Sequence, residues 1–214
     1  MFDLWGTLVP FPAASFDGAL EEIADVLNIS YARLAQLWDA TWRDRATGEL
    51  ARYLSGVCER SGVRPTPEQL ERVLKIRADA HRRLFLPRPD AGPTLARLRS
   101  RGIRTAVVSN TSSEVSAVWE ALPLAGMVDV AVFSCTEGLM KPDPRIFELA
   151  ATRLAVAPED CLYIGDGADE ELEGARAVGM EAILLRPGDT SPPCHWSGSE
   201  LASLSDVLAL LDSV

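Results

Sequence analysis

Cysteine and histidine are scarce in this sequence, and their scarcity argues against several classes of protein. The 214 residues include the cysteines Cys58, Cys135, Cys161 and Cys194 and the histidines His81 and His195. The cysteines lie far apart and contain no CxxC pair, so their spacing predicts neither a zinc site nor a disulfide framework. We therefore expect reduced cysteines in a cytoplasmic protein.

Long apolar runs and an excess of basic residues are also lacking. No run of about 18 apolar residues occurs, which argues against a membrane-spanning helix, and no basic segment precedes an apolar one at the N-terminus, which argues against a signal peptide. The net charge of −10 argues against nucleic-acid binding, because phosphate neutralisation requires a basic surface. We expect a small-molecule substrate. It can be anionic, because the local field of a cleft can oppose the net charge of the protein. We also expect a monomer or a homodimer without nucleic-acid or membrane partners.

Apolar residues make up 47% of the chain, enough for a sizeable core, and they follow two different patterns. From about Ser15 to Leu84 they recur at helical spacing, in segments with capping residues such as Ser30 and Thr66 at their start. Gln69 follows Thr66 at the spacing of a capping box. This part of the chain is therefore predicted to be helical throughout.

Beyond "LPRPDAGP", helices alternate with short apolar segments. We expect strands in "RTAVVSN", "VDVAVFS", "CLYIGD" and "EAILL", and a further strand in the opening "FDL". This alternation indicates an α/β fold, in which a parallel sheet is covered on both faces and is interrupted after its first strand by the helical segment. Because only Met1 and Phe2 precede Asp3, we also expect upstream residues to complete that first strand.

Chemically active side chains follow several of these strands. In such sheets, ligands bind beyond the carboxyl ends of the strands. The first expected strand ends in Asp3, the second ends in Ser109 and Asn110, the third leads into a loop with Lys141, and the fourth ends in Asp166. Two acids, a hydroxyl group and a lysine are therefore predicted to converge from separate segments.

This set of side chains suits the hydrolysis of a phosphate ester. A divalent cation held by Asp3 and Asp166, together with Lys141, would reduce the repulsion between a carboxylate nucleophile and the phosphoryl anion. Gly6 allows a tight turn whose amides can face phosphoryl oxygens, and Thr7 lies in the same candidate substrate-binding loop. Attack by Asp3 would produce a covalent acyl phosphate that water then hydrolyses.

Four segments, "DLWGT", "VVSN", "KPDPRIF" and "GDGADEELEGARAVGM", occur in the order typical of one family. Together they resemble the motifs of the haloacid dehalogenase superfamily of hydrolases, and the resemblance covers nearly all of the chain. It implies a Rossmann-like, doubly wound core formed by residues 1–12 and 86–214. It also implies a mobile α-helical cap, inserted after the first strand and formed by residues 13–85.

The resemblance further implies the roles of individual residues. Asp3 would be the nucleophile, and Ser109 and Lys141 would bind the phosphoryl group, with Asn110 next to them. The cofactor would be Mg²⁺, and its ligands are expected from the following set: Asp3, the backbone carbonyl of Trp5, Asp166 and a further acid. Spacing favours Glu171 over Glu170 as that acid.

Trp5 departs from the family pattern. Phosphatases of this family usually carry a second Asp there, which protonates the leaving alkoxide and later deprotonates the attacking water. Indole can do neither, and loss of a general acid typically costs about 100- to 10,000-fold in rate. The dehalogenases of the family, which lack this Asp, are similar to this chain in having an aromatic residue at this position. Halide leaves without a proton, so their chemistry does not need the acid. They lose the metal-binding acid, however, which this chain retains as Asp166.

These observations leave three functions open. The favoured one is Mg²⁺-dependent hydrolysis of a phosphorylated small molecule through an aspartyl-phosphate on Asp3, because a cluster of acids without a cation is electrostatically costly. The second is a 2-haloacid dehalogenase that uses Asp3 without metal. The third is a catalytically weak member of the family that binds a ligand or a partner.

The helical insert is expected to select the substrate. Trp38 and Trp42, four residues apart, are predicted to form the buried face of one helix. Arg43 and Arg45 on the same segment are candidates for binding an anionic substrate group.

Overall fold

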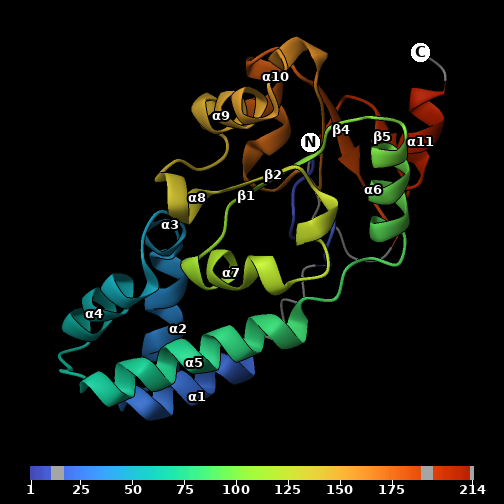
Figure 1. Ribbon diagram of the computed structural model, residues 1–214. Coiled ribbons are helices and arrows are strands. Elements are labelled where there is room, and N and C mark those ends of the chain that lie inside the picture. The colour runs from blue at the N-terminus through green and yellow to red at the C-terminus, as the bar shows by residue number, and fades with distance from the viewer. Residues whose placement is uncertain (11–16, 189–194, 213–214) are drawn as a thin grey trace.

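The computed structural model describes residues 1–10, 17–188 and 195–212. Figure 1 shows the first helices, drawn from blue to teal, gathered on one side of the molecule. They are α1 (Asp17–Leu27), α2 (Tyr31–Ala40), α3 (Trp42–Ala46), α4 (Leu50–Arg60) and α5 (Pro67–Leu84). The expected start of the insert, at residue 13, and Cys194 lie outside the described residues.

Helices α1, α2, α4 and α5 share a hydrophobic core of their own, built around residues such as Ile23, Leu34, Leu54 and Val73. The predicted capping box at the start of α5 is present, since the Thr66 side chain accepts from the backbone N–H of Gln69 and the Gln69 side chain accepts in return. This reciprocal bonding satisfies N–H groups that the first turn of a helix leaves unpaired.

The helix predicted to start after Ser30 differs in two ways. It is divided at Thr41 into α2 and α3, where the Thr41 hydroxyl donates to the carbonyl of Leu37 at 2.6 Å. Such back-bonding competes with the helical pattern and favours a bend. Ser30 precedes α2, but its side chain makes no capping hydrogen bond. Trp38 in α2 and Trp42 in α3 are both half-buried, so they do not form the buried face of one helix.

The sheet is parallel throughout its paired strands. The strands are β1 (Ala106–Ser109), β2 (Val130–Phe133), β3 (Leu162–Gly165), β4 (Glu181–Leu185) and β5 (Glu200–Leu201). Residues 1–3 lie between β1 and β3, because the N–H of Phe2 donates to Ala106 at 2.8 Å and the N–H of Asp3 donates to Ile164 at 2.9 Å. The order is therefore β2, β1, residues 1–3, β3, β4, β5.

Both faces of the sheet are covered, as the fold class predicts. The covering helices are α6 (Ala91–Ser100), α7 (Ser113–Val118), α8 (Ser134–Glu137), α9 (Pro144–Leu154), α10 (Glu171–Ala177) and α11 (Asp206–Leu211). Strand β1 illustrates the two layers, since Val107 packs with Leu95 of α6 and Val108 packs with Phe147 of α9. Short 3₁₀ turns connect several of these elements: η2 (Trp119–Ala121), η3 (Ala125–Met127), η4 (Pro158–Asp160) and η5 (Ala168–Glu170).

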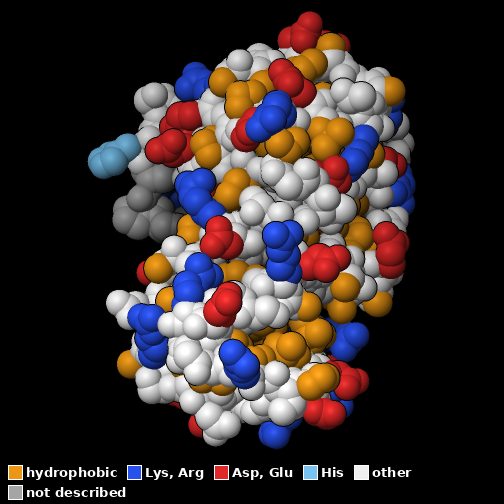
Figure 2. Space-filling view, turned by 90° about the vertical axis from the view of Figure 1, so that its left-hand side faces the viewer, with side chains coloured by type: hydrophobic (Ala, Val, Ile, Leu, Met, Phe, Trp, Pro, Cys, Tyr) orange, Lys and Arg blue, Asp and Glu red, His pale blue; other side chains and the backbone are white. Residues whose placement is uncertain are grey.

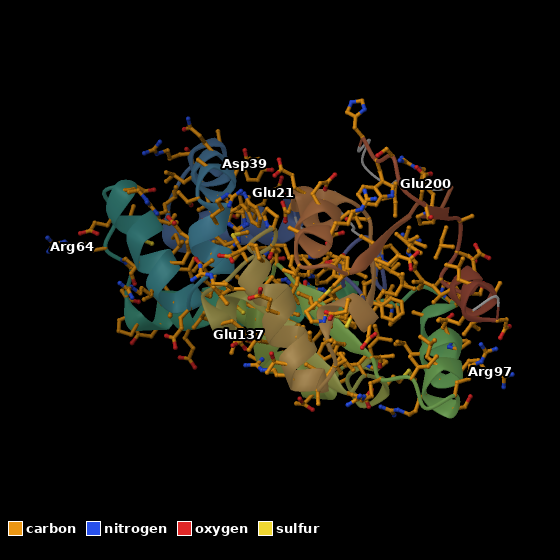
Figure 3. All side chains as sticks on the ribbon, turned by 90° about the horizontal axis from the view of Figure 1, so that it is seen from above. Glu21, Asp39, Arg64, Arg97, Glu137 and Glu200 are labelled. Atoms are coloured by element: carbon orange, nitrogen blue, oxygen red, sulfur yellow. The ribbon has the colours of Figure 1, made fainter. Side chains whose placement is uncertain are left out.

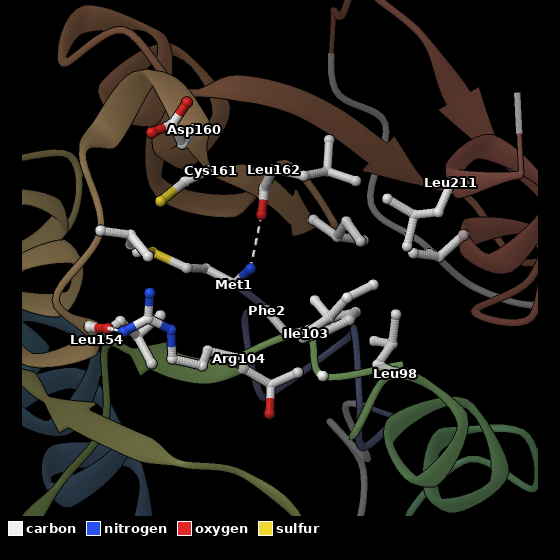
Figure 4. A pocket seen from close by; sticks show the side chains of 15 residues that line it. Met1, Phe2, Leu98, Ile103, Arg104, Leu154, Asp160, Cys161, Leu162 and Leu211 are labelled. Carbon is white, nitrogen blue, oxygen red and sulfur yellow. Dashed lines mark hydrogen bonds between the residues drawn. The ribbon is translucent and has the colours of Figure 1, made fainter. Parts of the chain in front are cut away.

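A cavity of about 290 Å³ opens at the amino ends of the central strands. Figure 4 shows it between Met1, Ile103 and Leu162. The candidate site residues lie at the opposite, carboxyl ends, so this cavity is separate from them. Among the helices of the described ranges, none combines the length and the apolar character that crossing a bilayer requires.

Charged side chains lie mostly at the surface. Figure 2 shows basic and acidic side chains interspersed on one face, and Figure 3 places residues such as Arg64 and Arg97 at the periphery of the molecule. Among the residues whose burial is described, six charged side chains are instead buried: Asp3, Arg77, Glu114, Lys141, Asp166 and Glu171. Because burying a charge is costly unless it is paired, each of them requires a partner or a ligand.

Candidate active site

Four of the buried charged residues meet at the carboxyl edge of the sheet. Asp3 follows Phe2 in the central position, Asp166 follows β3, Glu171 begins α10, and Lys141 lies in the loop before α9. Each of them is at most 4% exposed. Folding thus brings together residues that are more than 130 positions apart in the sequence, as Asp3 and Lys141 are.

Lys141 connects the members of this cluster. Its Nζ donates to Asp3 Oδ1 at 2.5 Å, to the Tyr163 hydroxyl at 3.1 Å and to Glu171 Oε2. Burial opposes the charged ammonium form, but the neighbouring charges of Asp3 and Glu171 outweigh that effect and raise the pKa of Lys141 above its ordinary value. Lys141 is therefore a permanent cation in this site.

The carboxylates outnumber this cation. Asp3, Asp166 and Glu171 each offer an oxygen that lies within 4.8 Å of the others. Burial raises the pKa of Asp3 well above its ordinary value against the lowering effect of Lys141, while burial and the charge of Glu171 raise the pKa of Asp166 to about 6. Such shifts are expected for acids that are buried close to one another.

The donor set fits a hard divalent cation such as Mg²⁺, which prefers oxygen ligands. Asp3 Oδ2 is buried and has no hydrogen-bond partner among the described residues. Among the described residues, the hydroxyls of Ser109 and Thr7 are also buried without partners, as are Ser61 Oγ, Thr94 Oγ1 and Glu114 Oε2 elsewhere in the fold. An unsatisfied buried polar group costs about 1–3 kcal/mol, and a ligand that bonded the oxygens of Asp3, Ser109 and Thr7 would remove that cost.

Two glycines make room for the carboxylates. Gly6 has a φ of +86°, a conformation that favours glycine, and a Cβ there would overlap the carboxylate of Asp166. A Cβ on Gly165, at the end of β3, would overlap the carboxylate of Glu171. The backbone therefore approaches both acids more closely than any other residue would permit.

Asn110 and Arg88 hold the loops of the site. The side-chain amide of Asn110 donates to the backbone carbonyl of Lys141 at 3.0 Å and accepts from the backbone N–H of Lys141 at 2.8 Å. Asn110 therefore anchors the loop that holds Lys141. The Arg88 guanidinium donates to the carbonyls of Thr7 and Gly6 at 2.9 Å each. Sequence reasoning missed Arg88, because "LPRPDAGP" indicates only a break between helices.

Trp5 connects the loop that follows Asp3 to the end of α5. It is half-buried, and its indole Nε1 donates to Thr111 Oγ1 at 3.3 Å. Its ring makes edge contacts with the rings of His81 at 6.0 Å and Phe85 at 5.7 Å between centroids. The indole therefore packs against the helical segment, and a second carboxylate is absent at this position of the sequence.

A second buried cluster lies where α5 meets α7. Arg77 Nε pairs with Glu114 Oε1 at 2.8 Å, and Nδ1 of His81 lies 2.9 Å from the carbonyl of Arg77. Burial and the charge of Arg77 lower the pKa of His81 to about 4, so this imidazole is neutral at pH 7. We name Arg45, Arg77, His81 and Glu114 the interface cluster.

The two arginines proposed from the sequence as substrate ligands occupy different surroundings. Arg45 is half-buried within the helical segment, where it donates to the carbonyl of Trp38 at 2.9 Å and to the Tyr53 hydroxyl at 3.3 Å. Arg43 is exposed, and its guanidinium donates to Sδ of Met140, the residue before Lys141, at 3.9 Å. Of the two, Arg43 is therefore the one in contact with the loop that holds Lys141.

Comparison with known proteins agrees with this arrangement. The sequence model of the haloacid dehalogenase-like hydrolases matches residues 1–179. The chain belongs to this family. It is 34% identical over 140 residues to the glyceraldehyde 3-phosphate phosphatase of Methanopyrus kandleri, a match that covers 64% of this chain and 59% of that protein. This chain thus spans less than two thirds of that relative's length.

One further relative supports membership of the family, and one solved structure has the same fold. The chain is 31% identical over 187 residues to the phosphoserine phosphatase of Thermus thermophilus, with 84% of this chain and 70% of that protein covered. A 2-haloacid dehalogenase from Pseudomonas syringae pv. Tomato has a TM-score of 0.76 at 22% identity and covers 99% of this chain and 96% of its own. The latter likeness establishes the fold alone, and it confirms a Rossmann-like sheet with inserted helices.

Proposed function

We propose that this family member hydrolyses phosphorylated small molecules in a Mg²⁺-dependent reaction, with Asp3 as the nucleophile. The observation that carries this proposal is the buried group of three carboxylates around one ammonium, within which Asp3 Oδ2 is unpartnered among the described residues. The phosphatase names of the two relatives with 34% and 31% identity support the same reaction class.

Asp3, Asp166 and Glu171 would hold the metal ion, and the backbone carbonyl of Trp5 is a further proposed ligand. A bound Mg²⁺ would supply positive charge that stabilises the phosphoryl oxygens during their transfer. We further propose that residues 13–85 form the cap that selects the substrate, over a core formed by residues 1–12 and 86–214.

The chain's own residues can perform the remaining steps. With Oδ1 bonded to Lys141, the free Oδ2 of Asp3 attacks phosphorus, and the leaving oxygen departs with the electron pair of its bond. Lys141 and the hydroxyls of Ser109 and Thr7 stabilise the phosphoryl oxygens. Water then attacks the phosphorus of the acyl phosphate, which releases inorganic phosphate and restores the carboxylate of Asp3.

Trp5 restricts the substrates of this reaction. Its indole N–H is directed at Thr111, and indole cannot protonate a leaving alkoxide. Acyl and aryl phosphates need no such proton, so we propose them as the preferred substrate class. The same residue favours a second candidate function, dehalogenation of 2-haloacids, because halide also leaves without a proton.

One experiment separates these functions. Acetyl phosphate, p-nitrophenyl phosphate, an alkyl phosphate and a 2-haloacid are each incubated with Mg²⁺ or with a chelator, and phosphate and halide release are measured. We expect phosphate release from the first two substrates, with Mg²⁺ only. Glu171→Gln should reduce this phosphate release. Glu173 is an exposed acid on the same helix, so Glu173→Gln is the matched control. Halide release in the presence of chelator would favour the dehalogenase, and no turnover of any compound would favour a binding protein.

A further inference from the structure

We infer that Tyr163 is a positioning residue of this site, whose hydroxyl fixes the direction of the Lys141 ammonium and of the Glu171 carboxylate. Sequence reasoning assigned Tyr163 only to an apolar strand. Its consequence for catalysis rests on the proposed function, but the geometry that it imposes on Lys141 does not.

Tyr163 is fully buried in β3, and its position is defined at both ends of the side chain. The ring packs edge-on against Phe147 of α9, with centroids 5.1 Å apart. The hydroxyl donates to Glu171 Oε2 at 2.8 Å and accepts from Lys141 Nζ at 3.1 Å. A phenol has one O–H and acceptor lone pairs, so it can make both bonds at once.

The hydroxyl accounts for the third hydrogen bond of the lysine. An ammonium has three N–H donors, and those of Lys141 meet Asp3, Glu171 and Tyr163, which lie on different segments of the chain. A lysine side chain is a point charge on a flexible stem, so its direction depends on its acceptors. Two of these acceptors are carboxylates, and Tyr163 is the neutral one.

The role of Tyr163 differs from those of Asp3 and Glu171 because its side chain is neutral. Removing Asp3 or Glu171 changes the electrostatic balance of the site, whereas removing the Tyr163 hydroxyl changes none of its charges. What is lost is one donor to Glu171 and one acceptor for Lys141. The expected effect is thus a loss of orientation at constant charge.

Gly165 complements this role. Side chains two residues apart on a strand face the same side, so Tyr163 and Gly165 share one face of β3. A Cβ on Gly165 would overlap the Glu171 carboxylate and would lie 3.1 Å from the Tyr163 ring. The glycine leaves the space that Glu171 fills, and the tyrosine then bonds the carboxylate within that space. Glu171 Oε1 is held in turn by the N–H of Gly167 at 3.1 Å.

The first test is spectroscopic and needs neither metal nor substrate. The sequence contains only two lysines, exposed Lys75 and buried Lys141, so ¹⁵N-lysine labelling yields one side-chain ammonium signal from each. We expect Tyr163→Phe to accelerate hydrogen exchange of the Lys141 ammonium by about tenfold, since about 1.4 kcal/mol of hydrogen bonding corresponds to that factor. An exchange rate equal to that of the wild type would overturn the inference.

The matched control is Tyr53→Phe. Tyr53 is also buried, and its hydroxyl bonds Thr41 at 2.9 Å and Arg45 at 3.3 Å within the helical segment. This variant loses a comparable buried hydroxyl, so it measures any general loosening of the fold. Lys141 exchange should stay at the wild-type rate in Tyr53→Phe, and equal acceleration in both variants would also overturn the inference.

The second test is kinetic. With p-nitrophenyl phosphate and Mg²⁺, Tyr163→Phe should lower kcat by about tenfold and leave KM within about twofold, because orientation matters most in the transition state. An unchanged kcat alongside faster Lys141 exchange would refute the catalytic part of the inference. If the wild-type protein hydrolyses nothing, the proposed function fails, while the exchange measurement still decides whether Tyr163 positions Lys141.

Discussion

The proposed catalytic cluster, formed by Asp3, Lys141, Asp166 and Glu171, and the interface cluster both contain buried charges, yet these charges are balanced in opposite ways. At the carboxyl edge of the sheet, three carboxylates share the ammonium of Lys141. At the junction of α5 and α7, the guanidinium of Arg77 pairs with the carboxylate of Glu114, and a second guanidinium, that of Arg45, is near enough to be affected by the charges of both. The first group has an excess of negative charge, and the second has an excess of positive charge.

The difference between the clusters lies in how each excess is compensated. Arg45 and Arg77 lie over the Trp38 ring, at 4.4 Å and 5.1 Å from its centroid, and Arg45 also lies over Tyr53. Aromatic faces stabilise such cations, so the protein itself compensates the excess positive charge of the interface cluster, although Glu114 Oε2 is buried without a hydrogen-bond partner among the described residues. In the candidate site, burial and the neighbouring acids raise the pKa values of Asp3 and Asp166. The interface cluster thus places its excess charge on aromatic rings, whereas under the proposed function a bound cation would compensate the excess charge of the candidate site.

The largest expected effect is on the catalytic cluster. Asp3→Asn should reduce hydrolysis of p-nitrophenyl phosphate by a factor on the order of 10⁴ or more, because an amide is a poor nucleophile. Phosphate release under Mg²⁺ measures the effect, with Asp160→Asn, an exposed acid at the opposite edge, as the control. Turnover near the wild-type rate in Asp3→Asn would mean that water attacks the substrate directly.

Breaking the interface cluster should instead reduce stability. Arg77→Ala leaves Glu114 buried without its ion-pair partner, which should lower the free energy of unfolding by about 3–5 kcal/mol. Urea unfolding measures this loss. The matched control is Arg82→Ala on the same helix, because Arg82 pairs with Asp79 at the surface and should contribute about 1 kcal/mol or less. Similar losses in the two variants would contradict the structural role of the buried pair.

The interface cluster should also make stability depend on pH. The pKa of His81 is lowered from 6.5 to about 4, so between these values the unfolded chain binds a proton that the folded chain does not. His81 should therefore contribute an increase in stability of up to about 3 kcal/mol as pH rises across this window, complete above it. Because Asp166 acts in the opposite direction over part of the same window, the measured quantity is the difference between the wild type and His81→Gln, which should lack this increase when unfolding is followed from pH 4 to 7. A rise of the same size in the variant would exclude His81 as its source.

Trp5 links the two clusters, and its replacement tests the link. Trp5→Asp places a carboxylate two residues after the nucleophile, which should raise the rate on alkyl phosphates relative to p-nitrophenyl phosphate by about 100-fold. It also removes the ring contacts with His81 and Phe85, so the melting temperature should fall. A folded variant with an unchanged rate ratio would show that the missing acid does not limit this protein.

The smallest expected effect is the stabilisation of the metal-free protein by Asp166→Asn. The folded pKa of Asp166, about 6, exceeds its ordinary value of 3.8, so the metal-free protein should lose stability as pH rises through this window. Asp166→Asn should abolish that loss, worth about 2 kcal/mol after allowance for solvent screening. Unfolding in chelator at pH 4 to 7 measures it. Mg²⁺ should then raise the melting temperature of the wild type more than that of the variant.

Local patterns in the sequence predicted much of the fold. The apolar segments before Ser109 and Asp166 form β1 and β3, and the capping box at Thr66 begins α5. Position at a strand end was enough to select Asp3, Ser109 and Asp166, because parallel strands end at one edge of a sheet. These features depend on residues close together in the chain, which is why they could be read from it.

Only the tertiary structure determined how these residues are paired. That Lys141 reaches Asp3, that Arg77 reaches Glu114 and that Tyr163 lies beneath Glu171 depends on segments that fold beside one another. The sequence does not distinguish a buried tyrosine or arginine from an exposed one. The fold sets the free-energy cost of burying the side chain and determines which group it bonds. The sequence by itself determined which chemical groups are available and on which strand ends they lie. The packing of distant segments determined which charges are neutralised within the protein and which are left for a ligand, because electrostatic pairing depends on distance in space and not on distance along the chain.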